Sequence, residues 1–129
     1  MSTLLLDTCA LVWWMADAPE ISRTARRAIR DPRHTILVSV VSLWEIAIKT
    51  RRGRLAGTEE YLSHYRELHE NWGFSTVVIE AADTVAAGAL MIPDDDPFDR
   101  MLIVQARRLA SAIVTCDEAI RRHATDTLW

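Results

Sequence analysis

The sequence predicts an α/β fold in which helices cover both faces of a mainly parallel sheet of four to five strands. Short apolar runs alternate with runs of helical periodicity along the chain, a pattern typical of parallel sheets. The length of 129 residues suits a single domain, residues 1–129. Half of the residues are hydrophobic and 26% are charged, which excludes a disordered or fibrous chain.

The first half of the chain predicts two strands and three helices. Ser22 is placed to cap the second helix, which must stop before Asp31-Pro32 because proline disfavours helical geometry in the residue before it. The expected elements are a strand over residues 3–6, a helix over 8–15 with Thr8 as a candidate N-cap, a helix over 23–30, a strand over 35–38, and a helix that begins at Ser39 or Ser42 and ends in a basic tail at Gly53.

The second half predicts four helices and three strands. Its first helix, opened by Thr58, is amphipathic, and Gly73 is a natural residue to end it. Asp96-Pro97 combines an N-cap with a proline in the first helical position. The expected elements are helices over residues 59–71, 81–90, 97–109 and 118–123, strands over 74–79 and 112–115, and a terminal edge strand over 127–129.

The charge balance and the cysteine count exclude several classes of protein. A net charge of −3 does not suit binding of nucleic acid by overall charge, so any such contact needs a local basic patch. No signal peptide is recognisable and no run approaches the roughly 18–20 apolar residues of a membrane span, so we expect a cytoplasmic protein without membrane contact. Cys9 and Cys116 are too few for a disulfide framework and are expected to be reduced, with a redox-sensitive pair as the alternative.

Four carboxylates lie in apolar surroundings. Asp7 and Asp117 follow strand candidates, and parallel sheets bind ligands at the carboxyl ends of their strands. Glu45 lies inside an otherwise hydrophobic helix, and Asp99 lies in the first turn of a helix, next to Phe98. Burial of an unpaired carboxylate is costly, so we expect each to be neutralised, paired or bound to a metal.

If the four acids converge, they need a cation between them. Two carboxylates about 5 Å apart repel by about 3 kcal/mol at an effective dielectric constant of about 20. Oxygen-only ligands favour Mg²⁺, with Mn²⁺ as a possible substitute, whereas zinc favours His or Cys. Such a site activates water and holds phosphate oxygens, which is the chemistry of metal-dependent phosphodiester hydrolysis. The catalytic and metal-binding candidates are therefore Asp7, Glu45, Asp99 and Asp117.

Each acid also has a structural interpretation. A carboxylate such as Asp99 suits the first turn of a helix because of the helix dipole. Asp117 and Asp7 are placed to cap helices, although Thr8 competes with Asp7 for that position. Glu45 neither caps a helix nor packs in a core, so its structural interpretation is the weakest of the four.

Polar residues beside the acids are candidates for supporting roles. The two threonine hydroxyls are placed to orient a carboxylate or a bound water, and the alternative for each is a capping or strand position. The serine lies one helical turn before Glu45, and the second aspartate is expected to cap its helix rather than bind metal. The arginine either neutralises the acids and contacts phosphate or is simply exposed. These residues are Thr8, Ser42, Asp96, Arg100 and Thr115.

The densest basic run follows Glu45 and is a candidate RNA-binding patch. A basic rim around an acidic centre suits a polyanionic substrate, whereas the alternative is a solvated helix end whose cations favour the dipole. The residues of this run are Lys49, Arg51, Arg52 and Arg54. The tryptophans Trp13, Trp14 and Trp44 are expected in the core or at a dimer interface, and the four histidines are expected at the surface.

Four blocks of the sequence resemble one known family. They are Leu-Leu-Leu-Asp7-Thr8, Ser42-Leu-Trp-Glu45-Ile, Asp96-Pro97-Phe98-Asp99-Arg100 followed by Gln105-Ala106, and Thr115-Cys-Asp117. In this order, over essentially the whole chain, they resemble the PIN-domain ribonucleases and in particular the VapC-type toxins of prokaryotic toxin–antitoxin systems.

The resemblance implies a PIN-like α/β/α sandwich, Mg²⁺-dependent endoribonuclease activity, homodimerisation and inhibition by a cognate antitoxin protein. It also implies that Asp7, Glu45, Asp99 and Asp117 bind the metal. One departure is that many relatives carry His at the position of Asp94, and we expect Asp94 and Asp95 to be solvated loop charges. The alternative function is a catalytically silent PIN-like module that binds RNA or protein.

Overall fold

A computed structural model, which describes residues 2–129, contains a sheet of five strands that all run parallel. The strand order is β3-β2-β1-β4-β5, so the first strand of the chain lies at the centre. The strands are β1 (Ser2–Leu6), β2 (His34–Ser39), β3 (Phe74–Val77), β4 (Ala112–Val114) and β5 (Thr127–Leu128). This arrangement confirms the predicted α/β class.

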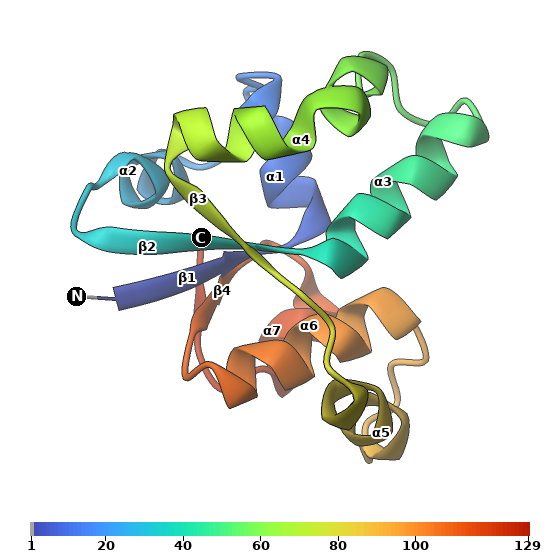
Figure 1. Cartoon of the computed structure of the whole chain (residues 1–129). Coiled ribbons are helices and arrows are strands. Elements are labelled where there is room, and N and C mark those ends of the chain that lie inside the picture. The colour runs from blue at the N-terminus through green and yellow to red at the C-terminus, as the bar shows by residue number, and fades with distance from the viewer. Residues whose placement is uncertain (1) are drawn as a thin grey trace.

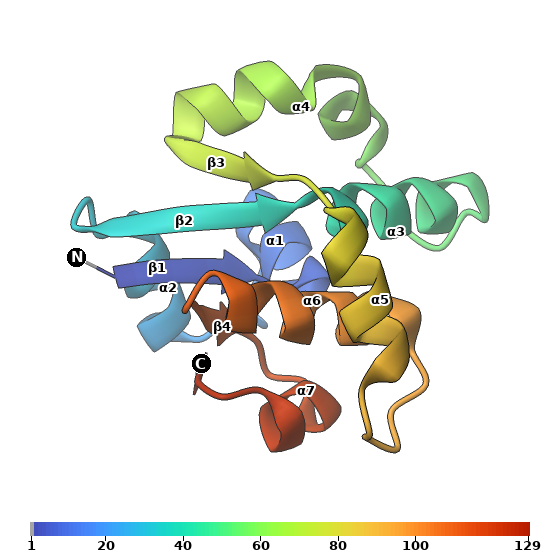
Figure 2. The same ribbon diagram turned by 60° about the horizontal axis from the view of Figure 1, so that its bottom comes forward.

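Seven helices of the described residues cover the two faces of the sheet. The helices α1, α2 and α4 pack on one face, and α5, α6 and α7 pack on the other, while α3 extends from the carboxyl end of β2 (Figures 1 and 2). The bounds are α1 (Thr8–Met15), α2 (Arg23–Arg30), α3 (Val40–Arg51), α4 (Glu59–Trp72), α5 (Ala81–Ala89), α6 (Pro97–Arg108) and α7 (Glu118–His123). None of these helices is long and apolar enough to cross a membrane.

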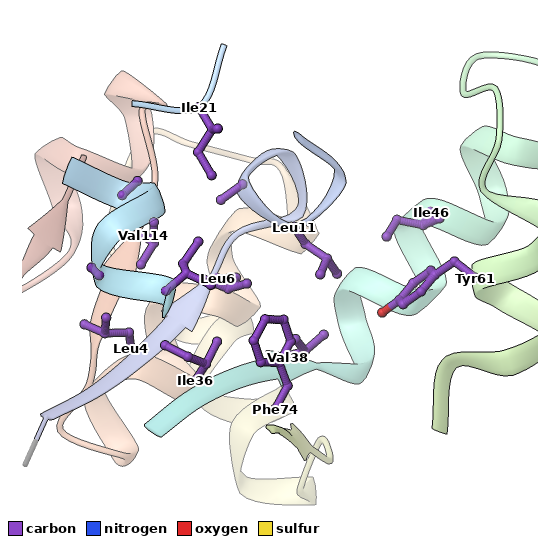
Figure 3. Close-up of a cluster of buried hydrophobic side chains, with 14 residues drawn as sticks. Leu4, Leu6, Leu11, Ile21, Ile36, Val38, Ile46, Tyr61, Phe74 and Val114 are labelled. Carbon is purple, nitrogen blue, oxygen red and sulfur yellow. The ribbon is translucent and has the colours of Figure 1, made fainter. Parts of the chain in front are cut away.

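The central strand separates two hydrophobic cores because successive side chains point to opposite faces. Leu4 and Leu6 of β1 join the core under α1, α2 and α4, which Figure 3 shows, whereas Leu5 joins the core under α5, α6 and α7. The continuous apolar run of β1 therefore fits a strand that is buried on both faces.

The strand order reverses at β1. The chain builds β2 and then β3 on one side of it, and returns to place β4 on the other side. The carboxyl ends of β1 and β4 therefore border the crevice in which sheets of this kind bind ligands. Asp7 follows β1 directly, and Thr115 follows β4 directly, so the topology brings the two ends of the chain together at this crevice.

Two helix starts differ from the simplest interpretation of the sequence. Asp7, and not Thr8, is the N-cap of α1: its Oδ1 accepts a hydrogen bond of 2.7 Å from the amide of Ala10. Ser39 is the N-cap of α3, which leaves Ser42 inside the first turn. Asp7 follows β1 directly, and Ser39 is itself the last residue of β2, so neither strand-to-helix connection contains a further loop residue.

The strand β3 is shorter than the predicted range of residues 74–79. It pairs only with β2, and the last partner of that strand is Ser39, opposite Val77. Because Ser39 already caps α3, β2 offers no further partner and the ladder ends there.

His69 contradicts the expected surface position of the histidines. Its side chain is buried on α4, where Nε2 lies 2.6 Å from the hydroxyl of Tyr61 and Nδ1 lies 2.8 Å from the hydroxyl of Thr76. The amphipathic pattern of α4 predicted a buried face with aromatic residues. His69 lies on this face, where a hydroxyl group is the partner of each of its ring nitrogens. Burial lowers the pKa of His69.

Candidate functional site

The centre of the site is a chain of hydrogen bonds between the ends of β1 and β4. The amide of Asp117 donates to Thr115 Oγ1 at 2.9 Å, and that hydroxyl donates to Oδ2 of Asp7 at 2.5 Å. Asp7 and Thr115 are both buried. Residues 108 positions apart in the sequence are thus joined by one hydroxyl, which fixes the orientation of the Asp7 carboxylate.

Asp7 is a buried acid without a positively charged partner. The pKa of Asp7 is raised to about 6, chiefly by burial and in smaller part by the negative charges of Asp117 and Glu45, against the opposing hydrogen bonds from Thr115 and Ala10. No arginine or lysine of residues 2–129 forms an ion pair with it. Its environment therefore lacks the cation that an ionised carboxylate requires.

Glu45 reaches the same region from α3. Its side chain is largely buried, and Oε2 forms an ion pair of 2.8 Å with Nζ of Lys49, one helical turn further along. The spacing of four residues places both side chains on one helix face. Lys49 therefore contacts one of the candidate acids. The spacing of four residues was the sequence signal for this ion pair. The interpretation of Lys49 as part of an RNA-binding patch did not use that signal.

Two hydroxyls join α3 to the first residue of α1. Thr8 Oγ1 donates a hydrogen bond of 3.0 Å to Ser42 Oγ, and both side chains are buried. Since Ser42 precedes Glu45 by one turn, this bond positions the helix face that carries the glutamate.

Asp99 stands in the first turn of α6 with other acids around it. Burial raises its pKa, followed by a hydrogen bond with the carboxyl of Asp94 and by the negative charges of Asp96, Asp94 and Asp117. Asp94 is half-buried, and its Oδ2 is buried without a hydrogen-bond partner in residues 2–129. The expectation that Asp94 is a solvated loop charge is therefore wrong. The sequence signal for a role of Asp94 other than a solvated charge was its position, at which many members of the family that the sequence resembles carry His.

Asp117 and Asp96 cap helices, as their structural interpretations predict. Asp117 Oδ1 accepts hydrogen bonds from the amides of Ala119 and Ile120 at 2.8 and 3.3 Å, which leaves its other oxygen available. Asp96 Oδ1 accepts from the amides of Phe98 and Asp99 in the same way. Capping by one oxygen and metal binding by the other are compatible, because a carboxylate has two oxygens.

Arg100 does not contact any of the acids. Its guanidinium donates to the backbone carbonyls of Ala87, Gly88 and Leu90 at the end of α5, and to that of Asp94. The expected role in neutralising the cluster is therefore not seen. Instead, the arginine holds the segment between α5 and α6 that carries the acidic run.

The basic run lies at the far end of α3. Arg51, Arg52 and Arg54 are exposed around the last turn of the helix and the residues that follow it, whereas Lys49 turns back toward Glu45. In Figure 1 this end of α3 projects away from the sheet. The run therefore forms a rim beyond the acids, and only Lys49 is shown in contact with one.

The donor set fits a hard divalent cation, although the acids do not already surround a point. They are carboxylates on the ends of β1, β4 and α6 and on α3, and oxygen ligands of this kind favour Mg²⁺. Within residues 2–129, no three His, Cys, Asp or Glu side chains are grouped closely enough to hold an ion. Glu45 is instead paired with Lys49. Cys9 and Cys116 are both free thiols.

Comparison with known proteins gives the family. The family model described as PIN domain matches residues 4–126, nearly the whole chain. The chain belongs to the PIN-domain family. A curated relative, Ribonuclease VapC22 of Mycobacterium tuberculosis, is 31% identical over 95% of this chain and 93% of its own length. This agrees with the resemblance seen in the four sequence blocks.

Solved structures share the PIN fold at low sequence identity. A chain of VapBC2 from Rickettsia felis, solved bound to a DNA fragment from its promoter, superimposes with a TM-score of 0.69 at 16% identity and is covered to 97%. A chain of FitAcB from Neisseria gonorrhoeae gives a TM-score of 0.56 at 13% identity and is covered to 96%. Each match covers 98% of this chain, which confirms the sandwich architecture.

Proposed function

We propose that this chain is a Mg²⁺-dependent endoribonuclease and the toxin of a toxin–antitoxin pair, with Mn²⁺ able to replace Mg²⁺. The observation that carries the proposal is the buried Asp7 carboxylate, which is held by Thr115 at the switch point of the sheet, faces the negative charges of Asp117 and Glu45, and has no cationic partner in residues 2–129. The similarity to a protein named a ribonuclease supports the choice of RNA as substrate.

The residues of the site have two kinds of role: the acids would bind the metal, and the hydroxyl groups position the acids. Asp7, Glu45, Asp99 and Asp117 would hold the metal. Mg²⁺ bound there would supply a Lewis acid for hydrolysis of a phosphodiester bond. The hydroxyl of Thr115 keeps Asp7 in one orientation, and the hydrogen bond between the side chains of Thr8 and Ser42 positions α3 and hence Glu45.

Lys49 serves this function as a local counter-charge. It balances Glu45 in the absence of metal, at 2.8 Å. With Mg²⁺ held by Glu45, the Lys49 ammonium group would be free to contact an RNA phosphate, in line with the exposed Arg51, Arg52 and Arg54 beyond it.

The proposal includes two protein partners and a compartment. An antitoxin is proposed because the sequence resembles VapC-type toxins and because the matched Rickettsia felis chain was solved as part of VapBC2. A second copy of the chain is proposed for the exposed apolar side chains of Trp44, Val78, Val85 and Met91, which belong to α3, α5 and the segments flanking α5. The cytoplasm is proposed because the RNA substrate is found there.

Cleavage of a structured RNA tests the function. Wild type should cut it with Mg²⁺ or Mn²⁺ and lose this activity with EDTA, and Asp7→Asn and Asp99→Asn should lose most of it in every buffer. Asp95→Asn, which removes an exposed carboxylate from the segment just before α6, is the matched control and should remain active. Equal cleavage under all conditions would refute the proposal, and RNA binding by wild type without cleavage would favour a silent binding module.

Metal binding can be measured without activity. Mg²⁺ should raise the Tm of the wild type and of Asp95→Asn but not of Asp99→Asn, because a ligand that binds only the folded state stabilises it. Identical shifts in all three proteins would show that the acids do not form the metal site.

A further inference from the structure

Arginine side chains gather on one face of α2, away from the acids. They border a surface hollow of about 550 Å³. Its lining consists only of charged residues, namely Arg23, Arg26, Arg27, Arg30, Asp31 and Arg33. Five positive charges against one negative charge concentrate here in a chain whose net charge is −3.

Three of these arginines have no partner within residues 2–129. Arg26 pairs with Asp17 and donates to the carbonyl of Ala18, and Arg33 pairs with Asp31. The guanidinium groups of Arg23, Arg27 and Arg30 are exposed and form no hydrogen bond or ion pair in this part of the chain. They are therefore available to an external anion.

The helix dipole does not account for the whole group. Arg27 and Arg30 lie in the last turn, where a positive charge is favoured, but Arg23 is the first residue of α2, where it is disfavoured. Three unpaired like charges within eight residues also repel one another. A bound polyanion would remove both costs.

The hollow lies near the amino ends of the strands, whereas the acids lie near their carboxyl ends. The helix α2 leads into the amino end of β2, whereas Asp7 follows the carboxyl end of β1 (Figure 1). The five residues of β1, at about 3.3 Å each, separate these two ends of the sheet by roughly 17 Å. A folded RNA is large enough to touch both.

The character of the hollow favours nucleic acid over a protein partner. The centre of a protein–protein interface is apolar and enriched in aromatic residues, and the residues lining this hollow include none of either kind. Interfaces with nucleic acid are polar and strongly basic. Arginine also binds phosphate through two parallel hydrogen bonds.

We infer that the unpaired arginines of α2, Arg23, Arg27 and Arg30, form a second RNA-binding surface that contacts the phosphate backbone of the substrate remote from the acidic site. The inference rests on the proposed ribonuclease function and adds to it a contact that sets affinity and salt dependence but takes no part in the cleavage step. The partner is the phosphate backbone, so this surface reads no base sequence.

The double variant Arg23→Gln/Arg27→Gln tests this surface, with Arg66→Gln/Arg107→Gln as the control that removes two exposed arginines elsewhere. The first variant should raise KM for a structured RNA several-fold and leave kcat unchanged. It should also reduce the slope of log Kd against log salt by about 1.4 to 1.8, since each lost phosphate contact accounts for about 0.7 to 0.9. The control should leave the slope and KM as in the wild type.

A conservative variant separates charge from folding. Arg23→Lys/Arg27→Lys keeps the charge and should retain the wild-type salt slope, while no variant should have a Tm below that of the wild type. An unchanged salt slope in the glutamine variant would overturn the inference, as would an equal loss in the control. Loss of affinity for the antitoxin with RNA binding intact would assign the surface to a protein partner instead. Absence of cleavage by the wild type would refute the proposed function itself, which is a separate result.

Discussion

At the scale of single residues, Asp7 combines two tasks that the sequence presented as alternatives. One of its oxygens caps α1 and the other accepts the hydroxyl of Thr115, so the carboxylate is held in place by the fold before any ligand arrives. The interpretation of Asp7 as a cap is confirmed. It is compatible with the proposed role in metal binding, since the cap fixes the direction of the carboxylate and its burial without a cation favours a bound one.

Asp99→Asn is expected to stabilise the metal-free protein while it abolishes cleavage. A raised carboxyl pKa means that the ionised group opposes folding at neutral pH, so the loss grows as pH rises above the ordinary value near 4. Removal of the charge should raise the free energy of unfolding in EDTA by on the order of 1 kcal/mol. Urea unfolding measures this, with Asp95→Asn as the control that should change little. A destabilised Asp99→Asn would contradict the environment described for this acid.

His69 should make the protein less stable in mild acid. Burial lowers its pKa, so the unfolded chain takes up a proton near pH 6.5 while the folded chain stays neutral to a lower pH. This titration leaves the free energy of unfolding of the wild type unaffected above pH 6.5 and should lower it as the pH decreases below 6.5. In His69→Gln the fall in Tm between pH 7.5 and 5 should be smaller, whereas the exposed His64→Gln should match the wild type. Parallel curves for all three proteins would rule out this titration.

At the scale of elements, the short connections determine where the acids lie. The helix α1 begins directly after Asp7, and Ser39 ends β2 and caps α3. The acidic end of α6 has a different support, because Arg100 ties it to the carbonyls at the end of α5. An arginine that the sequence suggested as a neighbour of the acids thus acts on the backbone that presents them.

Arg100→Met should loosen the segment between α5 and α6. The change removes four hydrogen bonds to backbone carbonyls. Hydrogen bonds to charged groups contribute about 1.5–3 kcal/mol each when buried, so a loss of about 2–3 kcal/mol is expected for this partly exposed group. Activity should fall together with stability, because Asp99 precedes Arg100 in the first turn of α6, directly after this segment. Thermal unfolding and cleavage assays measure both, and Arg107→Met on the same helix should have a small effect; a normal Tm for Arg100→Met would disprove the role.

At the scale of the whole molecule, the structure presents three surfaces of different character. The acids lie near the carboxyl ends of the strands at the switch point, and the arginines of α2 lie near the amino ends. The exposed apolar side chains lie around α3 and α5. An apolar hollow of about 290 Å³ lies between α3, α5 and α6 and is bordered by Trp44, Ala87 and Met101. Exposed apolar surface of this kind indicates a protein interface.

Val85→Glu should weaken the proposed homodimer. Val85 is 73% exposed on α5, and a buried carboxylate without a partner would oppose association. Sedimentation should show a shift from dimer toward monomer at a concentration where the wild type is dimeric. Thr24→Glu, an exposed position on α2 across the sheet, should leave the mass unchanged. A wild type that is monomeric at all concentrations, or a dimeric Val85→Glu, would refute this interface.

The elements and the candidate acids could be predicted because their signals are local. Ser22 and Asp96 cap the helices that the sequence assigned to them, and the apolar run of β1 marks the central strand. Contacts between distant segments carried no such signal. Nothing near Thr115 in the sequence shows that its hydroxyl is bonded to Asp7, and nothing on α4 shows that His69 reaches Thr76.

The sequence by itself determined the alternation of strands and helices and the family, and it proposed four candidate acids, because periodicity, caps and motif spacing are properties of short stretches of chain. Only the tertiary structure decided which oxygens of those acids remain available, that Lys49 pairs with Glu45, and that Asp94 turns inward to Asp99. The physical reason is that burial and charge at a site are sums over neighbours from several elements, and the order of the strands selects those neighbours.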